Sequence, residues 1–300
     1  MKIKPRRSLL FAPGSNARAL EKAKTLPADC VILDLEDSVA PEQKDSARSA
    51  LAQVLGKGGF NSGGFGAREV IVRVNGLDTP WGAADVAALA NCGADALLFP
   101  KMACAQDVLE ATAAMEKSGS PSSVAVWAMI ETASGVLNAA EIAASSHRSR
   151  LRALVIGAND LVRETRMEPG PGRANLTPWL LQILLAARAY GLDIFDSVYN
   201  DFSDSAGFAA QCAQARALGF DGKTLIHPNQ IAACNGAFTP QADEIAWARS
   251  VIAAFETPEN AGKGAIALNG AMVERLHLDS ALRVRALADY LDAGDGDQGL

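Results

Sequence analysis

The chain has 300 residues, of which 49% are hydrophobic and 21% are charged, and its formal net charge is −6 at pH 7. This composition is typical of a globular protein with a large core. The acidic balance argues against nucleic acid as a partner, because phosphate backbones require clustered Lys and Arg. Five cysteines without a CxxC pair indicate free thiols in a reducing compartment. The apolar run near the start is too short for a signal peptide or a membrane span, so we predict a cytoplasmic protein.

Short apolar runs recur along the chain at intervals of roughly thirty residues, and a polar or turn residue follows each of them. Each run is nearly continuous in apolar residues, which is typical of parallel strands covered on both faces. The predicted strands are Ser8–Pro13, Cys30–Asp37, Glu69–Asn75, Ala96–Lys101, Val124–Glu131, Ala153–Asp160, Asp193–Asn200 and Gly222–Pro228.

Ala-rich amphipathic stretches lie between these runs. The predicted helices are Asn16–Thr25, Trp81–Asn91, Ala105–Lys117, Val136–Ala144, Leu180–Tyr190 and Ser205–Leu218. Eight alternating strand–helix units predict an α/β fold of the (β/α)₈ TIM barrel type. A doubly wound sheet is disfavoured, because the first turn reads PGSNARAL and carries no GxGxxG.

Two segments fall outside this repeat. Gly56–Gly66 is glycine-rich and is interpreted as a flexible connector. The predicted barrel covers residues 1–237, and residues 238–300 are predicted to form a C-terminal helical extension with a helix at Gln241–Glu256, a loop at Pro258–Gly270 and a helix at Leu278–Leu291. The end, DAGDGDQGL, is predicted to be disordered. Such an extension commonly packs on a neighbouring subunit or folds over the site, so we expect a homo-oligomer.

Polar residues recur at the carboxyl ends of the predicted strands, where TIM barrels carry their active sites. Arg73, Lys101, Glu131 and Asp160 follow one another at spacings of 28, 30 and 29 residues, one unit each. Any single acid at a strand end is as readily a helix cap or a structural ion pair. The shared phase of the set nevertheless predicts one common site. The set comprises Asp34, Glu36, Asp37, Arg73, Asn75, Lys101, Glu131, Asp160, Asp196 and His227.

Glu131 and Asp160 are the candidate metal ligands. Two carboxylates on neighbouring strands, without Cys or paired His, suit a hard cation such as Mg²⁺. The planar guanidinium of Arg73 is suited to bidentate binding of a carboxylate. Metal and arginine together predict a receptor for a 2-oxo or 2-hydroxy acid.

The segments RRSLLFAPGS, VILDLEDSVAPEQK, VIVRVNGLDTPWG, LLFPK, MIETASGV, GANDL and GFDGKTLIHPNQI occur in this order along the chain. Together they resemble the HpcH/HpaI aldolase–citrate lyase β-subunit family, in particular its CoA-ester lyase branch of malyl-CoA and citramalyl-CoA lyases. The resemblance implies a TIM barrel assembled as trimers or hexamers. It also implies Mg²⁺ at Glu131 and Asp160, with Arg73 holding the carboxylate of the oxo acid.

The resemblance also assigns supporting roles. Glu36 and Asp37 would support metal-bound waters or orient Arg73. Since a metal would already polarise the carbonyl, Lys101 is expected to act as an electrostatic support or ion-pair partner. Three further basic residues match positions where family members contact the phosphates of CoA: Arg7, Arg18 and Lys22.

The chain departs from the family at one place. Members that act on CoA esters often carry Met-Val-Asp near the C-terminus, and the resemblance implies that this Asp reaches into a neighbouring subunit's site. This chain reads GAMVERLHL, with Glu274 in place of Asp. Either Glu274 or a metal-bound hydroxide would take the hydroxyl proton. The predicted activity is cleavage of a malyl-, citramalyl- or citryl-type 3-hydroxyacyl thioester to acetyl-CoA, or an acetyl-carrier protein, and a 2-oxo acid. A metal-dependent aldolase acting on free hydroxy-oxo acids and a non-catalytic oxo-acid-binding subunit remain as alternatives.

Overall fold

The computed structural model describes residues 4–56, 64–66 and 68–296. Most of the predicted glycine-rich connector, residues 57–63, therefore lies outside the described residues. The described chain divides into two compact units, Arg7–Phe238 and the residues 4–6 together with 239–296. Among the described helices, none combines the length and apolar character that crossing a bilayer requires.

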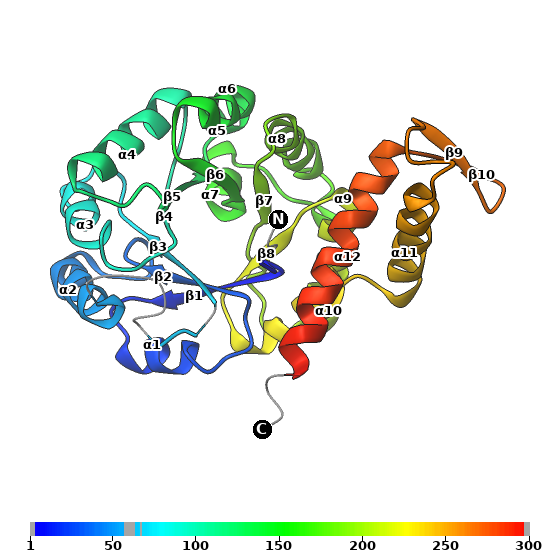
Figure 1. Cartoon of the computed structure of the whole chain (residues 1–300). Helices are drawn as coiled ribbons and strands as arrows, with labels where there is room; N and C mark the ends of the chain where they lie inside the picture. Colours follow the sequence, from blue (N-terminus) through cyan, green and yellow to red (C-terminus); the bar gives the residue numbers. More distant parts are fainter. Residues whose placement is uncertain (1–3, 57–63, 67, 297–300) are drawn as a thin grey trace. The chain divides into compact units, whose positions relative to one another are not determined.

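The first unit is a closed barrel of parallel strands in which each strand pairs with the next along the chain and β8 pairs with β1 (Figure 1). The predicted (β/α)₈ barrel is therefore confirmed. The strands are β1 (Ser8–Pro13), β2 (Cys30–Asp34), β3 (Glu69–Arg73), β4 (Ala96–Phe99), β5 (Ala125–Ile130), β6 (Leu151–Ile156), β7 (Asp193–Asp196) and β8 (Gly222–Leu225).

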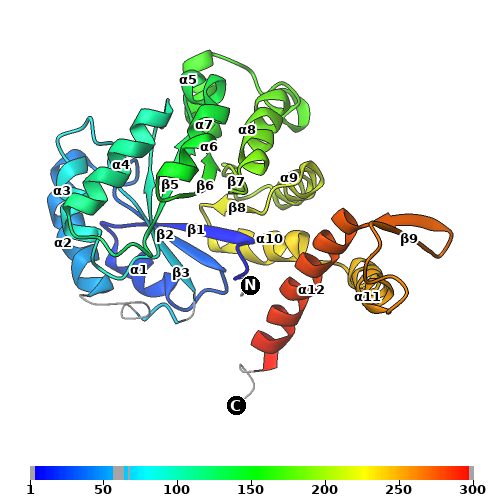
Figure 2. The ribbon, with the colours of Figure 1, turned by 45° about the horizontal axis from the view of Figure 1, so that its top comes forward.

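Helices surround the barrel on its outside (Figure 2). They are α1 (Ala17–Ala23), α2 (Lys44–Leu55), α3 (Gly82–Leu89), α4 (Ala105–Lys117), α5 (Ala133–Leu137), α6 (Ala139–Ala144), α7 (Ala158–Thr165), α8 (Thr177–Ala189), α9 (Ser205–Leu218) and α10 (Ile231–Phe238). Short 3₁₀ turns lie at Pro41–Gln43, Ser145–Arg148, Pro171–Arg173 and Pro228–Gln230.

The helix predicted at Val136–Ala144 is divided into α5 and α6. Thr132 caps α5 by accepting a hydrogen bond from the backbone N–H of Gly135, and α5 ends at Leu137, before Asn138. Helices α2, α7 and α10 lie outside the stretches that were named as examples from the sequence.

Two layers of apolar side chains explain why these residues form strands. Successive side chains of a strand point to opposite faces, so one set fills the barrel and the other packs under the helices. Inside the barrel, Trp127 of β5 stacks on Phe195 of β7 with ring centroids 5.0 Å apart, and both rings are fully buried. Burial of two large aromatic rings stabilises the barrel by several kcal/mol, on the order of 2–3 for each side chain.

Strand β1 has the predicted bounds, and the other seven strands end earlier than predicted, which places the polar residues. Strand β4 ends at Phe99, and Lys101 adopts a left-handed conformation with φ of 53°. Glu131 directly follows β5. Asp160 was predicted to end a strand, but it lies in the first turn of α7, because β6 ends at Ile156 and the chain turns at Gly157.

The second unit contains α11 (Ala242–Glu256), β9 (Ala265–Leu268), β10 (Ala271–Glu274) and α12 (Arg275–Gly296). The predicted loop at Pro258–Gly270 was wrong in its second half, because β9 and β10 form an antiparallel hairpin. Its two turn residues, Asn269 and Gly270, both have positive φ, as tight hairpin turns require.

The predicted disordered end was also wrong in part. Helix α12 continues to Gly296, so residues 292–296 are helical, and residues 297–300 lie outside the described residues. The first half of α12 takes part in a small core of this unit, in which Ala281 packs with Val251, Phe255 and Ile266.

Candidate active site

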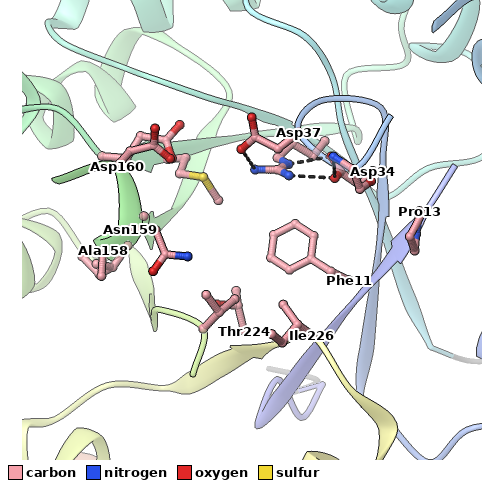
Figure 3. Close-up of a pocket in the computed structure, with 16 residues that line it drawn as sticks. Phe11, Pro13, Asp34, Asp37, Ala158, Asn159, Asp160, Thr224 and Ile226 are labelled. Carbon is pink, nitrogen blue, oxygen red and sulfur yellow. Dashed lines mark hydrogen bonds and ion pairs between the residues drawn. The ribbon is translucent and has the colours of Figure 1, made fainter. Parts of the chain in front are cut away.

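A cavity of about 380 Å³ lies at the carboxyl ends of the barrel strands. Its polar lining includes Asp34, Asp37, Arg73, Glu131 and Asp160. Figure 3 shows Asp34 and Asp37 on one side of the cavity and Asp160 on the other. Ser38, Asn159 and Thr224 add uncharged polar groups to the lining. The rest of the wall consists of Phe11, Pro13, Met129, Ile156, Gly157, Ala158, Val198 and Ile226.

Arg73, the last residue of β3, is held on two edges. Its Nε and Nη2 donate to the two carboxylate oxygens of Asp34 at 2.6 and 2.7 Å. Burial acts to raise the pKa of Asp34, but the Arg73 charge and its hydrogen bonds outweigh burial and hold that pKa below its usual value. Burial likewise acts to lower the pKa of Arg73, and the Asp34 charge reverses this effect and raises it. The bidentate edge predicted to hold a substrate carboxylate is thus engaged by Asp34.

The third guanidinium nitrogen of Arg73 points to the other acids of the loop after β2. Its Nη1 lies 2.9 Å from Glu36 Oε2 and 3.4 Å from Asp37 Oδ2. The aromatic ring of Phe11 lies under the guanidinium, 4.9 Å from its central carbon. Stacking on an aromatic face and hydrogen bonds at the edges fix the plane of the guanidinium.

Lys101 joins Glu36 to Glu131. Its Nζ donates to Glu36 Oε1 at 2.6 Å, and its backbone N–H donates to Glu131 Oε1 at 2.9 Å. The left-handed backbone of Lys101 is uncommon for a residue with a side chain, and such conformations concentrate at functional sites. One residue therefore positions two carboxylates, one through its side chain and one through its backbone.

Glu131 is a buried carboxylate, and both its burial and the negative charges nearby disfavour its ionised form. Only 2% of the residue is exposed. Burial, with the negative charges of Glu36 and Asp160, raises the pKa of Glu131 to about 8, and the hydrogen bond from Lys101 opposes this rise. At neutral pH the carboxylate is therefore largely protonated unless a cation is brought to it.

Asp160 lies in the first turn of α7 and lines the same cavity. Its Oδ1 accepts a hydrogen bond from Nη2 of the exposed Arg163 at 2.5 Å. Between Asp160 and β6 stands Gly157, where a Cβ atom would overlap the Glu131 side chain. Glycine at this position thus leaves the space that Glu131 occupies.

These residues fit a hard divalent cation. Glu131 and Asp160 face one cavity, and their mutual repulsion contributes to the raised pKa of Glu131. The cavity is lined by carboxylates and contains neither Cys nor His among its described lining residues, which suits Mg²⁺. Within the described parts of the chain, no three His, Cys, Asp or Glu side chains are grouped for a metal. A pair of carboxylates is the usual protein contribution to a magnesium site, which water and substrate oxygens complete.

The other predicted site residues lie elsewhere. Arg7 precedes β1 at the opposite end of the barrel, where its Nε and Nη2 donate to both oxygens of Asp29 at 2.7 and 2.8 Å. Arg18 and Lys22 are exposed and lie one turn apart on α1, which follows the carboxyl end of β1. Glu274 ends β10 in the second unit and is half-buried.

Asp196, another acid at a strand end, does not join the cavity. Its carboxylate is fully buried outside the barrel, paired with Arg173 at 2.6 Å and with Lys223 at 2.8 Å. It is a structural ion pair, which the sequence had left open. Conversely, the role of Asp34 as the partner of Arg73, the ring of Phe11 and the clearance at Gly157 were not predicted. The sequence signal for Asp34 and Gly157 is their position at or directly after a strand end, whereas Phe11 lies inside β1 and has no such signal.

A closed eight-stranded βα barrel with carboxylates, an arginine and a lysine at its carboxyl edge defines a protein of the TIM-barrel enzyme class. The chain belongs to the HpcH/HpaI aldolase/citrate lyase family, whose model matches residues 7–228. The predicted family is therefore confirmed.

Similar proteins cover nearly the whole chain. A (3S)-malyl-CoA thioesterase of Cereibacter sphaeroides is 47% identical over 289 residues, 96% of either chain. The citrate lyase subunit beta of Escherichia coli is 39% identical over 293 residues, which cover 96% of this chain and 95% of that protein. The solved structure of protein CitE from Mycobacterium tuberculosis, in complex with magnesium, acetoacetate and coenzyme A, has a TM-score of 0.69 and 32% identity, and covers 95% of this chain and 99% of that chain. The prediction of an enzyme of the citrate lyase β-subunit type is confirmed by these relatives.

Proposed function

We propose that this protein is a magnesium-dependent carbon–carbon lyase that cleaves a 3-hydroxyacyl thioester of the malyl, citramalyl or citryl type. The observation that carries the proposal is the pair of carboxylates, Glu131 and Asp160, in one cavity with Arg73. The solved relative with magnesium, acetoacetate and coenzyme A supports both the metal and CoA as the carrier.

Glu131 and Asp160 would hold the metal, and Arg73 would hold the carboxylate of the substrate. The metal, when bound, supplies a Lewis acid for the oxygens of the 2-hydroxy acid portion. Arg73 Nη1 is the nitrogen for the substrate, since its contact with Asp37 is the longest in the cluster at 3.4 Å and Asp37 is largely exposed. Asp34, Glu36 and Phe11 keep the guanidinium in place while this contact is exchanged.

The bond changes of the lyase step are those of a retro-Claisen cleavage. The hydroxyl proton passes to a base, the C–O bond becomes the C=O of a 2-oxo acid, and the neighbouring C–C bond breaks. Its electron pair moves into the thioester as an enolate, which is then protonated on carbon to give the acetyl thioester.

Glu274 is the proposed base. It lies in the second unit, so the proposal includes a homotrimer or hexamer in which the partner subunit's Glu274 reaches the cavity. The thioester carrier is proposed to be CoA, because Arg18 and Lys22 present two exposed cations near the mouth of the barrel, and phosphates bind such cations. Arg7 is left out of this role, because it lies at the far end and is paired with Asp29.

A second candidate is hydrolysis of the same thioester. The relative at 47% identity carries the name (3S)-malyl-CoA thioesterase, which favours this alternative. The two activities differ in products, because hydrolysis gives free CoA and a hydroxy acid, while cleavage gives acetyl-CoA and a 2-oxo acid.

One incubation separates the candidates. The protein is mixed with malyl-, citramalyl- or citryl-CoA, with Mg²⁺ or with a chelator, and acetyl-CoA, free CoA and the trapped 2-oxo acid are measured. Equal amounts of acetyl-CoA and 2-oxo acid, dependent on Mg²⁺, are expected. Free CoA with a hydroxy acid would establish the hydrolase instead. Conversion of a free 4-hydroxy-2-oxo acid, or pyruvate binding with no turnover of any thioester, would reject the lyase.

The Glu274→Gln variant tests the proposed base. It is expected to lose at least tenfold in kcat while keeping the affinity for pyruvate in the presence of Mg²⁺, because the base acts on the hydroxyl and the metal pair holds the acid. Unchanged kcat would remove Glu274 from the mechanism.

A further inference from the structure

Behind the acids of the cavity lies a buried lysine that the proposed mechanism does not use. Lys44 begins α2, and only 5% of it is exposed. Its Nζ donates to the backbone carbonyl oxygens of Leu35 and Glu36, both at 2.7 Å, and to Asn75 Oδ1 at 2.8 Å. A lysine ammonium carries three N–H groups, so this set of acceptors uses them all.

Asn75 links the same loop to the neighbouring unit of the barrel. Its Nδ2 donates to the carbonyl oxygen of Leu35 at 3.0 Å and to Asp85 Oδ2 at 2.6 Å, and its backbone N–H donates to Asp85 Oδ2 at 3.0 Å. Asp85, fully buried in α3, also accepts from Arg48 Nε of α2 at 2.6 Å. The loops after β2 and β3 are therefore joined by buried, charge-assisted hydrogen bonds, which are the stronger kind.

The loop held by Lys44 is the one that carries Glu36. The carboxylate of Glu36 reaches two cations of the site, Arg73 Nη1 at 2.9 Å and Lys101 Nζ at 2.6 Å. Its backbone carbonyl is one of the acceptors of Lys44. The position of the Glu36 side chain thus depends on a backbone that Lys44 holds from behind.

We infer that Lys44 is a positioning residue of this site, which fixes the backbone at Leu35 and Glu36 so that the Glu36 carboxylate meets Arg73 and Lys101 together. Lys44, Asn75 and Asp85 are not among the described residues that line the cavity, so Lys44 acts through Glu36 and not on the substrate. No other side chain replaces it readily. Arginine spreads its donors over a plane and cannot direct three N–H groups from one nitrogen, and methionine leaves the three oxygens without a donor.

The test is a double-mutant cycle on the thioester-cleavage activity, and in this arm the inference rests on the proposed function. Lys44→Met is expected to lower kcat by roughly tenfold to a hundredfold, the range for misplacement of site residues by about an ångström. If Lys44 acts through Glu36, the Lys44→Met/Glu36→Gln double variant is no slower than Glu36→Gln alone within about twofold. Losses that multiply in the double variant would overturn the inference, because they would show that Lys44 acts independently of Glu36.

Arg188→Met is the matched control. Arg188 makes a two-pronged ion pair with Asp221 at 2.9 Å for each contact, and Asp221 directly precedes β8, at the amino end of the barrel. This variant is expected to lower the melting temperature as Lys44→Met does, yet to keep kcat within about twofold of the wild type. A loss of kcat in the control equal to that of Lys44→Met would also overturn the inference.

A binding measurement separates this inference from the proposed function. The affinity for pyruvate in the presence of Mg²⁺, measured by calorimetry, is expected to fall at least fivefold in Lys44→Met and to remain unchanged in Arg188→Met. If the wild type cleaves no thioester, the proposed function fails and the pyruvate affinities alone decide on Lys44. If Lys44→Met does not fold, Asn75→Ala takes its place, and an unchanged pyruvate affinity in that variant would reject the role of this loop.

Discussion

Replacing Glu131 by Gln is predicted to stabilise the metal-free protein while abolishing its binding of Mg²⁺. Glutamine has nearly the same shape, and its amide oxygen still accepts the backbone N–H of Lys101. It lacks the charge that burial and the neighbouring carboxylates oppose. The variant therefore separates two effects of the Glu131 carboxylate, which are its destabilisation of the folded state and its binding of Mg²⁺.

The pKa of Glu131, about 8 instead of the ordinary 4.5, determines how much folding stability its ionisation costs. The folded state binds this proton more tightly than the unfolded state, so stability falls as pH rises through the window from 4.5 to 8 and is constant above it. One pKa unit corresponds to about 1.4 kcal/mol, so the wild type loses roughly 3 kcal/mol by pH 7 and somewhat more at pH 8. For a barrel of this size that difference is a melting-temperature gap of roughly 5–10 °C.

The assay is thermal unfolding of both proteins between pH 5 and pH 9, with chelator and with Mg²⁺. Without metal, the melting temperatures are expected to be closest at pH 5 and to diverge above it, with Glu131→Gln the more stable. Added Mg²⁺ is expected to raise the melting temperature of the wild type and not that of the variant. A ligand of the folded state stabilises only the protein that binds it. A variant that is less stable than the wild type at pH 8 without metal, or that gains equally from Mg²⁺, would refute the reasoning.

Three further predictions concern the surroundings of the carboxylate pair. Gly157→Ala is expected to abolish Mg²⁺ binding in calorimetry while the protein still folds, because its methyl group overlaps the Glu131 side chain; retained affinity would show that Glu131 has room to move. Arg163→Gln is expected to raise the Mg²⁺ affinity about threefold, because Arg163 competes with the metal for the Asp160 carboxylate and an exposed ion pair is worth under roughly 1 kcal/mol. An unchanged or lower affinity would contradict this. Lys101→Gly is expected to be more stable than Lys101→Ala by about 1 kcal/mol in denaturant unfolding, because glycine adopts a positive φ without strain. Equal stabilities of the two variants would argue against strain at this position.

Most of the fold and the central residues of the site were predictable from local patterns. Continuous apolar runs at a regular interval predict buried parallel strands, and eight of them predict a closed barrel. Since all carboxyl ends of parallel strands meet at one edge, the phase of Arg73, Glu131 and Asp160 along the chain was sufficient to bring them to one cavity.

Local patterns failed where partners lie far apart in the chain. The hairpin of β9 and β10 was predicted as a loop, because two short Ala-containing strands, partly exposed, carry no strong periodicity. The bidentate ion pair between Arg73 and Asp34 could not be predicted from the sequence either. It depends on the pairing of β2 with β3, in which Asp34 lies opposite Arg73.

Asp34 and Asp196 show most directly what the sequence determined and what only the tertiary structure decided. Both are aspartates that end an apolar strand, and the sequence determined that much. In the barrel Asp34 points the same way as Ile32, toward the interior and the cavity, while Asp196 points the same way as Ile194, outward under the helices. Side chains alternate along a strand, so a shift of one residue exchanges the two faces. Which acid serves the site was therefore decided by the register in the closed barrel and by the cations that each face supplies.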